Sequence, residues 1–200
     1  MDKITINTYN QLASEYDEET TGFWDDHPRE FIDKFTELAF GKKVLDVGSG
    51  PGRDGLILRE KGLDVTCLDA SQAMIDFCSA RGLRAVMGDY NSMPFGDRSF
   101  DAVWAYTSLL HAKKSAVDIP LIEVSRVLRP NGVIGLGMIE GKGEGYRESA
   151  GVNKPRWFSY YTESEIRSLM EKHGFDILFF SKFQPRASNY LNFIARKSSS

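Results

Sequence analysis

The chain has 200 residues, of which 42% are hydrophobic and 26% charged, as expected for one globular domain with a sizeable core. Its formal net charge is −3, so no general basic character favours nucleic acid or an anionic membrane as a partner. The N-terminal residues lack the apolar core of a signal peptide and no stretch is long enough to span a bilayer, which predicts a cytoplasmic protein. The two cysteines, Cys67 and Cys78, lie in apolar surroundings and predict buried free thiols.

The first 139 residues predict an N-terminal helical segment followed by strands and helices in alternation. Tyr9 to Phe40 predicts two helices, broken around Gly22 and Pro28. From Lys43 to Ile139, short apolar runs alternate with amphipathic stretches, a pattern typical of βαβ units on a parallel sheet. The predicted strands are Lys43 to Val47, Leu63 to Leu68, Leu83 to Met87, Phe100 to Ala105 and Val133 to Ile139. The predicted helices begin near Asp54, Ser71 and Asp118, and a turn at 129–132 precedes the fifth strand.

The remaining third of the chain predicts a loop, a helix and a hairpin. Three glycines within six residues predict a mobile loop from Glu140 to Gly145. A Thr-x-x-Glu capping box at Thr162 predicts a helix to His173. Two last strands are predicted to pair as an antiparallel hairpin at the sheet edge, Phe175 to Phe183 and Tyr190 to Ala195. The whole pattern indicates an α/β fold with a seven-stranded, mainly parallel sheet, an antiparallel C-terminal strand and helices on both faces.

A glycine-rich loop, Asp46 to Gly52, follows the first predicted strand. At the carboxyl edge of a parallel sheet, glycines allow a ligand to approach the backbone without meeting a Cβ atom. The dinucleotide fingerprint Gly-x-Gly-x-x-Gly would need a third glycine at position 53, which is Arg53. A phosphate-binding P-loop would need Gly-Lys-Ser/Thr, whereas this chain continues with an aspartate, Asp54. The spacing therefore disfavours phosphate ligands.

The segment Val44 to Gly52 resembles motif I of the class I S-adenosylmethionine-dependent methyltransferases. Further segments resemble other landmarks of that family, in its order: Thr66 to Ser71, Met87 to Tyr90 with Met93 to Phe95, Ser99 to Val103, and Arg126 to Val133. The resemblance covers roughly Val44 to Ile139 and looks like that of a small, stand-alone methyltransferase domain. It implies a Rossmann-like fold, S-adenosylmethionine as the methyl donor and S-adenosylhomocysteine as the product.

The resemblance also implies roles for three carboxylates. Asp46 would hold the methionine ammonium, Asp69 the ribose hydroxyls and Asp89 the adenine amino group. The alternatives are a helix cap for Asp46 and Asp69, a turn residue for Asp89 and plain core packing for Met74. The complete expected donor-binding set is Asp46, Gly48, Ser49, Gly50, Gly52, Asp69, Ala70, Met74, Asp89, Tyr90 and Ala105.

The expected reaction is an in-line displacement that needs no metal, with an oxygen or nitrogen atom of a small molecule as the acceptor. His111, just past the fourth strand, is the candidate general base, and the alternative is a histidine that only lines the pocket. Lys142, Arg147, Lys154 and Arg156 suggest an acceptor with a carboxylate or phosphate, although a solvated basic loop would look the same. The expected acceptor-binding set is Tyr9, Tyr16, Tyr106, Arg147, Trp157 and Tyr160.

We expect one methyltransferase domain over residues 1–200. Within it, residues 1–40 form a helical cap, 41–139 a donor-binding core, 140–161 a substrate-side loop, and 162–197 a C-terminal helix and hairpin. No membrane or nucleic-acid partner is expected, and the sequence leaves monomer and homodimer open. Three alternatives also remain open: a non-catalytic S-adenosylmethionine-binding regulatory subunit, an RNA methyltransferase, and a nucleotide-dependent oxidoreductase.

Overall fold

The computed structural model describes residues 1–26, 29–149, 152–185 and 187–198, and its centre is a seven-stranded sheet. The strand order is β3-β2-β1-β4-β5-β9-β8. Strands β1 to β5 run parallel, whereas β9 is antiparallel to both β5 and β8, which confirms the predicted C-terminal hairpin. The bounds are β1 Lys43–Val47, β2 Asp64–Asp69, β3 Arg84–Met87, β4 Phe100–Tyr106, β5 Leu128–Ile139, β8 Phe175–Phe183 and β9 Tyr190–Lys197.

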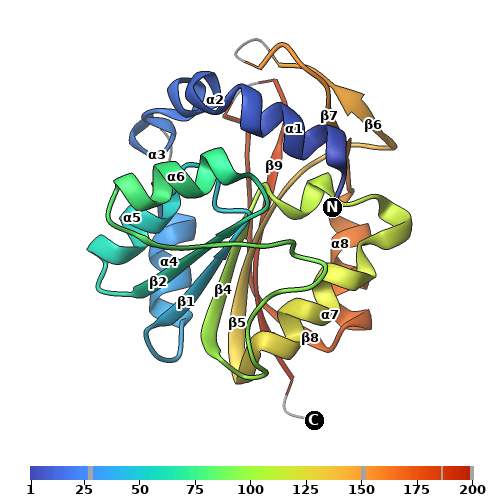
Figure 1. Cartoon of the computed structure of the whole chain (residues 1–200). Helices are drawn as coiled ribbons and strands as arrows, with labels where there is room; N and C mark the ends of the chain where they lie inside the picture. The colour runs from blue at the N-terminus through green and yellow to red at the C-terminus, as the bar shows by residue number, and fades with distance from the viewer. Residues whose placement is uncertain (27–28, 150–151, 186, 199–200) are drawn as a thin grey trace.

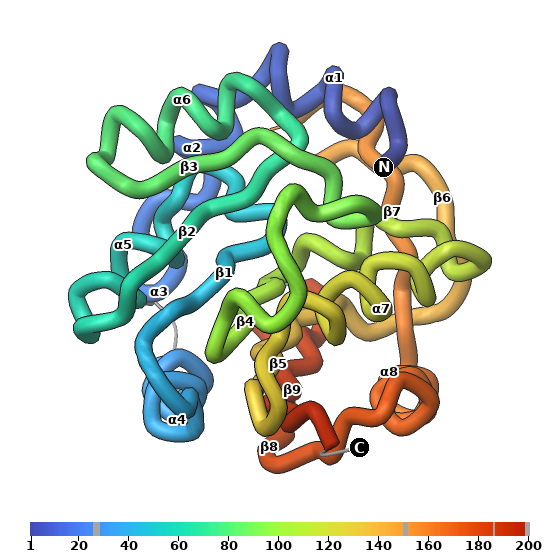
Figure 2. The backbone as a smooth tube through the Cα atoms, turned by 60° about the horizontal axis from the view of Figure 1, so that its bottom comes forward, coloured from blue at the N-terminus to red at the C-terminus, as the bar shows by residue number. Residues whose placement is uncertain are grey.

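Helices cover both faces of this sheet, as predicted. The hydrophobic core on one face includes residues of α4, α5 and α6, and the core on the other face includes residues of α7 and α8. Figure 2 shows α4 and α5 on one side of the sheet and α7 and α8 on the other. None of the helices within the described residues has the length and apolar character to cross a membrane. The bounds are α4 Glu30–Leu38, α5 Arg53–Glu60, α6 Gln72–Ala80, α7 Asp118–Val127 and α8 Glu163–Lys172.

Strand β5 begins earlier than the sequence predicted. The turn expected at 129–132 is part of this strand, which pairs with β4 at Leu128 and again from Val133 onward. The register shifts between these two pairings, and Asn131 takes a left-handed conformation at φ 64°. The turn residues are therefore accommodated as an irregularity inside a strand, because pairing with β4 resumes beyond them.

The N-terminal segment forms more helices than the two that were predicted. Helices α1 (Lys3–Gln11), α2 (Ala13–Thr20) and α3 (Phe23–Asp26) precede α4. The predicted break at Gly22 is present, at φ 73°, whereas Pro28 lies outside the described residues. Figure 1 shows α1 and α2 across the top of the sheet, above the carboxyl ends of its parallel strands.

A carboxylate on α2 connects the N-terminal helices to two helices beside the sheet. Asp17 accepts hydrogen bonds from Arg53 Nε at 2.9 Å and from Arg81 Nη2 at 2.8 Å. Arg53 is the residue that departs from the dinucleotide fingerprint, and Arg81 follows α6. Asp17 therefore fastens the cap to two helices of the core, α5 and α6.

The prediction of a loop over 140–145 is wrong for its last two residues, 144 and 145. Strand β6 (Glu144–Arg147) pairs antiparallel with β7 (Arg156–Ser159) in a separate two-stranded sheet. Glu144 Oε2 accepts hydrogen bonds from Ser159 Oγ at 2.9 Å and from the Lys114 amide at 2.7 Å. A partner strand nine to fifteen positions further along the chain thus supplies hydrogen bonds that the glycine content gave no reason to expect.

The predicted capping box of α8 is present. Thr162 Oγ1 accepts from the Glu165 amide at 3.3 Å, and Glu165 Oε2 accepts from the Thr162 amide at 2.7 Å. Thr162→Ala is expected to lower the free energy of unfolding by about 1 kcal/mol, because an N-terminal amide loses its partner. Urea denaturation measures this change. Thr162→Ser keeps the hydroxyl and should stay near wild type, and equal losses in both variants would contradict the capping role.

Candidate functional site

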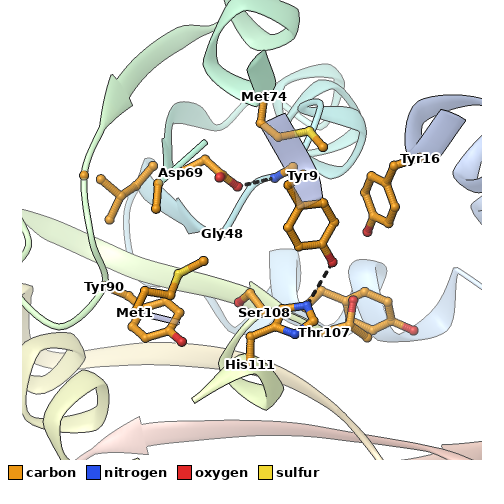
Figure 3. Close-up of a pocket in the computed structure, with 15 residues that line it drawn as sticks. Met1, Tyr9, Tyr16, Gly48, Asp69, Met74, Tyr90, Thr107, Ser108 and His111 are labelled. Carbon is orange, nitrogen blue, oxygen red and sulfur yellow. Dashed lines mark hydrogen bonds between the residues drawn. The ribbon is translucent and has the colours of Figure 1, made fainter. Parts of the chain in front are cut away.

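Two adjoining hollows lie at the carboxyl edge of the sheet beneath α1 and α2. The smaller, of about 40 Å³, lies over the end of β2, and the larger, of about 270 Å³, extends toward β7. Figure 3 shows Tyr9, from α1, between the side chains of Asp69 and His111. The residues that line both hollows are Tyr9, Tyr16, Gly48, Gly50, Tyr106, Thr107 and His111.

The glycine loop is held in a shape that other residues would not tolerate. Gly48 has φ 66°, and a Cβ atom there would lie 2.4 Å from Ser108 Cβ in the loop after β4. The amides of Gly48 and Ser49 both donate to the carbonyl of Leu68, at 2.7 and 3.1 Å. Gly48 therefore brings the ends of β1 and β4 together at the floor of the site. Gly52 has a different role, since it precedes α5, packs near Cys78 and lines neither hollow.

Asp69 ends β2 and faces the smaller hollow. Its Oδ2 atom accepts from the Gly50 amide and its Oδ1 atom from the Ser71 amide, both at 2.9 Å. Burial raises the pKa of Asp69 to about 6, against the opposing effect of these backbone hydrogen bonds. Ala70, Met74 and Tyr90 line the same hollow. A carboxylate here is placed to accept hydrogen bonds from a pair of hydroxyls.

The pKa of Asp69 predicts a pH dependence of donor binding. The ionised carboxylate accepts the hydrogen bonds of ribose hydroxyls, so its protonation weakens them. The affinity for S-adenosylmethionine is therefore expected to fall as the pH drops below about 6, by up to about tenfold per pH unit. Titration calorimetry across this range measures the change. An affinity that stays constant from neutral pH down to about pH 5 would contradict this role of Asp69.

Asp46, one residue before the end of β1, is a buried carboxyl group without a complete set of partners. It is 2% exposed, and its Oδ2 atom has no hydrogen bond within the described part of the chain. Burial, together with the charge of nearby Asp54, raises the pKa of Asp46 well above its usual range. Asp54, in contrast, accepts from the indole nitrogens of Trp24 and Trp104, at 2.7 and 2.8 Å. An ammonium group in the larger hollow would satisfy the unpaired oxygen of Asp46.

His111 lies below the two hollows and is 5% exposed. Its Nδ1 atom contacts the carbonyl oxygen of Trp157, and its Nε2 atom lies 2.9 Å from the hydroxyl of Tyr9. A carbonyl only accepts, so Nδ1 carries the proton and Nε2 accepts from Tyr9. Burial lowers the pKa of His111 to about 4, which leaves the ring uncharged at neutral pH.

Arg156 places a buried cation beside Tyr9. It is 4% exposed, and the charge of Glu19 acts on it. Its Nη1 atom donates to the Tyr9 hydroxyl at 3.1 Å and its Nη2 atom to Ser149 Oγ at 2.7 Å. The guanidinium also lies over the rings of Tyr9, Tyr16 and Phe158, at 5.2–5.8 Å from their centroids. Aromatic faces therefore stabilise this charge.

Several residues expected at the site line neither hollow. Asp89 pairs with the amino group of Met1 and accepts from the Asn91 amide at 2.9 Å. Ala105 lies in the core, and Arg147 is exposed on β6. Trp157 contributes only its carbonyl to His111. The complete group outside both hollows is Gly52, Asp89, Ala105, Arg147, Trp157 and Tyr160.

Other residues that line the site were not expected there. Thr107 and Ser108 follow β4 at the same edge as the glycine loop, and Thr107 has φ 51°. Their place directly after a strand end was a usable signal. Phe158, Ile139 and Tyr190 reach the larger hollow from strands that only the tertiary structure brings to this edge.

Residues 45–136 match a protein-family model described as a methyltransferase domain. The fatty-acid O-methyltransferase of Mycolicibacterium smegmatis is 40% identical over 99 residues, which cover 46% of this chain and 35% of that protein. The chain spans less than half of the length of the curated relatives that it matches. The family-model match covers the strands and loops that carry Asp46, Gly48 and Asp69.

Two solved structures share the fold over nearly the whole chain. The CcbJ methyltransferase of Streptomyces caelestis has a TM-score of 0.77 at 18% identity, covering 99% of this chain and 100% of that one. The 1,6-didemethyltoxoflavin N1-methyltransferase of Burkholderia thailandensis, solved with S-adenosylhomocysteine, has a TM-score of 0.72 at 21% identity, covering 96% and 88%. At these identities the likeness concerns the fold.

The strand order, the antiparallel hairpin and the glycine loop after β1 define a Rossmann-like methyltransferase fold. The methyltransferase-domain match over residues 45–136 and the shared fold support a class I S-adenosylmethionine-dependent methyltransferase. The site fits the donor of this family on the geometry of its own residues. The unpaired Asp46 oxygen suits an ammonium group, Asp69 suits the ribose, and the glycines leave the loop open to a ligand.

Proposed function

We propose that this protein transfers a methyl group from S-adenosylmethionine to an oxygen or nitrogen atom of a small molecule. The observation that carries the proposal is the meeting of two hollows at Gly48 and His111, one beside Asp69 and one walled by aromatic side chains. The larger hollow is covered by α1 and α2, which favours a small acceptor over a macromolecule. The names of a fatty-acid and a didemethyltoxoflavin methyltransferase support this class of acceptor.

In this proposal the chain's main contribution is to position the two reactants. S-adenosylmethionine, when bound, supplies a methyl group on a sulfonium sulfur, and its C–S bond breaks with both electrons left on sulfur. Asp46 holds the ammonium group, Asp69 holds the ribose, and Met74 and Tyr90 pack beside the adenine. Holding reactants in line can contribute about 7–11 kcal/mol in favourable systems. The aromatic wall keeps water away from the acceptor.

We also propose the division of labour along the chain that the sequence indicated. Residues 1–40 cap the site and 41–139 form the donor-binding core. Residues 140–161, which include β6 and β7, form the acceptor side, and 162–197 complete the sheet. Tyr9 and Tyr16 from the cap, and Phe158 from β7, meet over the larger hollow, which supports these assignments.

Calorimetry with S-adenosylmethionine, S-adenosylhomocysteine and NAD tests the choice of donor. Mass spectrometry of methylated products, after incubation with a panel of small hydroxyl and amine compounds, tests the reaction. We expect binding of the first two ligands, no binding of NAD, and methylation of at least one compound. NAD binding without S-adenosylmethionine binding would favour an oxidoreductase. Donor binding without consumption, with RNA included in the panel, would favour a non-catalytic role.

A further inference from the structure

Both ring nitrogens of His111 are engaged within the chain. Nδ1 donates to the Trp157 carbonyl and Nε2 accepts from the Tyr9 hydroxyl at 2.9 Å. The ring is also packed edge-on against Tyr9 and Phe158, at centroid distances of 5.5 and 5.0 Å. His111 therefore has no free nitrogen for a substrate, although its ring lines both hollows. A direct role as the general base would require these contacts to break.

The hydroxyl oxygen of Tyr9 has one position left for a ligand. A phenol oxygen donates one hydrogen bond and accepts two. Its proton points to His111 Nε2, and one lone pair accepts from Arg156 Nη1 at 3.1 Å. The second lone pair remains, and Tyr9 lines both hollows. Figure 3 shows the ring of Tyr9 crossing the site from α1, with its hydroxyl at the His111 ring.

We propose that Tyr9 is the catalytic residue that takes the proton from a hydroxyl group of the acceptor and passes its own proton to His111. This proposal rests on the proposed function and narrows it to hydroxyl acceptors. Arg156 acts as a positioning residue, because its hydrogen bond fixes which lone pair of the Tyr9 oxygen faces the ligand. The three residues come from α1, β7 and the short 3-10 helix Leu109–His111 after β4, so only the folded chain assembles them.

The proton steps balance without any further reactant. The O–H bond of the acceptor breaks, its proton forms a new O–H bond on Tyr9, and the former Tyr9 proton forms an N–H bond at His111 Nε2. The acceptor oxygen keeps the electron pair that holds the methyl carbon. The imidazolium that results keeps its Nδ1 hydrogen bond to Trp157 and returns its proton to water after the product leaves.

The low basicity of His111 is compatible with this relay. As the oxygen–methyl bond forms, the acceptor proton becomes that of a protonated ether, a strong acid, so a weak base suffices late in the reaction. The charged and titratable groups that act on His111 are Arg156 on β7, Asp2 before α1 and Tyr9 on α1. With its pKa at about 4, His111 is unprotonated throughout the neutral range and ready to accept. The rate should therefore show no histidine inflection near neutral pH.

Histidine ¹⁵N NMR tests the relay without any acceptor, because the chain has only three histidines. We expect wild-type His111 to remain neutral with its proton on Nδ1, and Tyr9→Phe to shift the Nε2 resonance by removing its hydrogen bond. His111→Gln assigns the signals. A proton on Nε2, or no response to Tyr9→Phe, would overturn the relay.

Methylation of phenol and of 4-nitrophenol at about pH 8 tests the chemical role, because the second compound is already ionised there. We expect Tyr9→Phe and His111→Gln to lower kcat on phenol by about 10²-fold or more, with little change in KM, and to spare 4-nitrophenol. Equal losses on both compounds would reduce Tyr9 to a positioning residue and overturn the proposal. Turnover of amines but of no hydroxyl compound would overturn the hydroxyl assignment. Absence of all turnover would contradict the proposed function, whereas the NMR result still decides the relay.

Discussion

Asp46→Asn is expected to weaken S-adenosylmethionine binding and, at neutral pH, to make the ligand-free protein more stable. Asp46 is 2% exposed, and one of its oxygens has no partner among the described residues. Its ionised form is disfavoured by burial and by Asp54, so a neutral amide relieves that energy. The same charge is the natural partner of the donor ammonium. Function and stability therefore make opposite demands at this position.

The expected magnitudes are a loss of donor affinity of at least about tenfold and a gain in unfolding free energy of about 0.5–2 kcal/mol. Because the pKa of Asp46 is raised in the folded state, wild type loses stability relative to the variant as the pH rises from about 4. At lower pH residue 46 is uncharged in wild type and in the variant, so the difference between their unfolding free energies should shrink. Calorimetry and urea denaturation at several pH values measure both effects.

Asp101→Asn is the matched control for this substitution. Asp101 is also a buried carboxylate, but it pairs with Arg129 and accepts from the Lys43 amide at 3.0 Å, away from the hollows. The same change there should lower stability and leave donor affinity unchanged, because it breaks contacts that already exist. A loss of stability in both variants would contradict the unsatisfied state of Asp46 in the free protein.

Gly48→Ala is expected to abolish measurable donor binding and to lower the unfolding free energy by several kcal/mol. The new Cβ would lie 2.4 Å from Ser108 Cβ, and both atoms belong to packed backbone segments that cannot yield by a side-chain rotation. Relief of the clash must move the ends of β1 and β4 apart, which displaces the loop and its neighbours in both hollows. Calorimetry measures binding, and circular dichroism separates a folded, non-binding variant from an unfolded one.

Gly62→Ala separates backbone strain from this clash. Gly62 also has a positive φ, 87°, but a Cβ atom there would meet nothing within 4 Å. The substitution is expected to cost about 1–2 kcal/mol of stability and to leave donor binding intact. Equal effects of Gly48→Ala and Gly62→Ala on stability and on donor binding would show that the close approach of Gly48 to Ser108 does not matter for function.

The sequence alone determined the parts of this protein whose signals are local. The alternation of apolar runs predicts the parallel strands, because each buried strand must be apolar along its length. The Thr162 capping box and the glycine loop are patterns of a few neighbouring residues whose geometry follows from backbone sterics and hydrogen bonding. Asp46 and Asp69 follow the same logic, because a carboxylate at the end of a parallel strand reaches the edge where ligands bind.

The tertiary structure alone decided the acceptor side. Strands β6 and β7 pair with each other, which the conformational preferences of their residues do not predict. The segment that was predicted as a loop therefore forms one side of the larger hollow, with Arg156 and Phe158. Trp157 is next to Phe158 in the same strand but lines neither hollow, because successive side chains of a strand point to opposite faces. Tyr160, beyond the end of β7, also lines neither hollow. His111 was identified from its position after β4. The hydrogen bond from the Tyr9 hydroxyl to His111 Nε2 joins residues that are 102 positions apart in the chain. It forms only because α1 packs over the sheet.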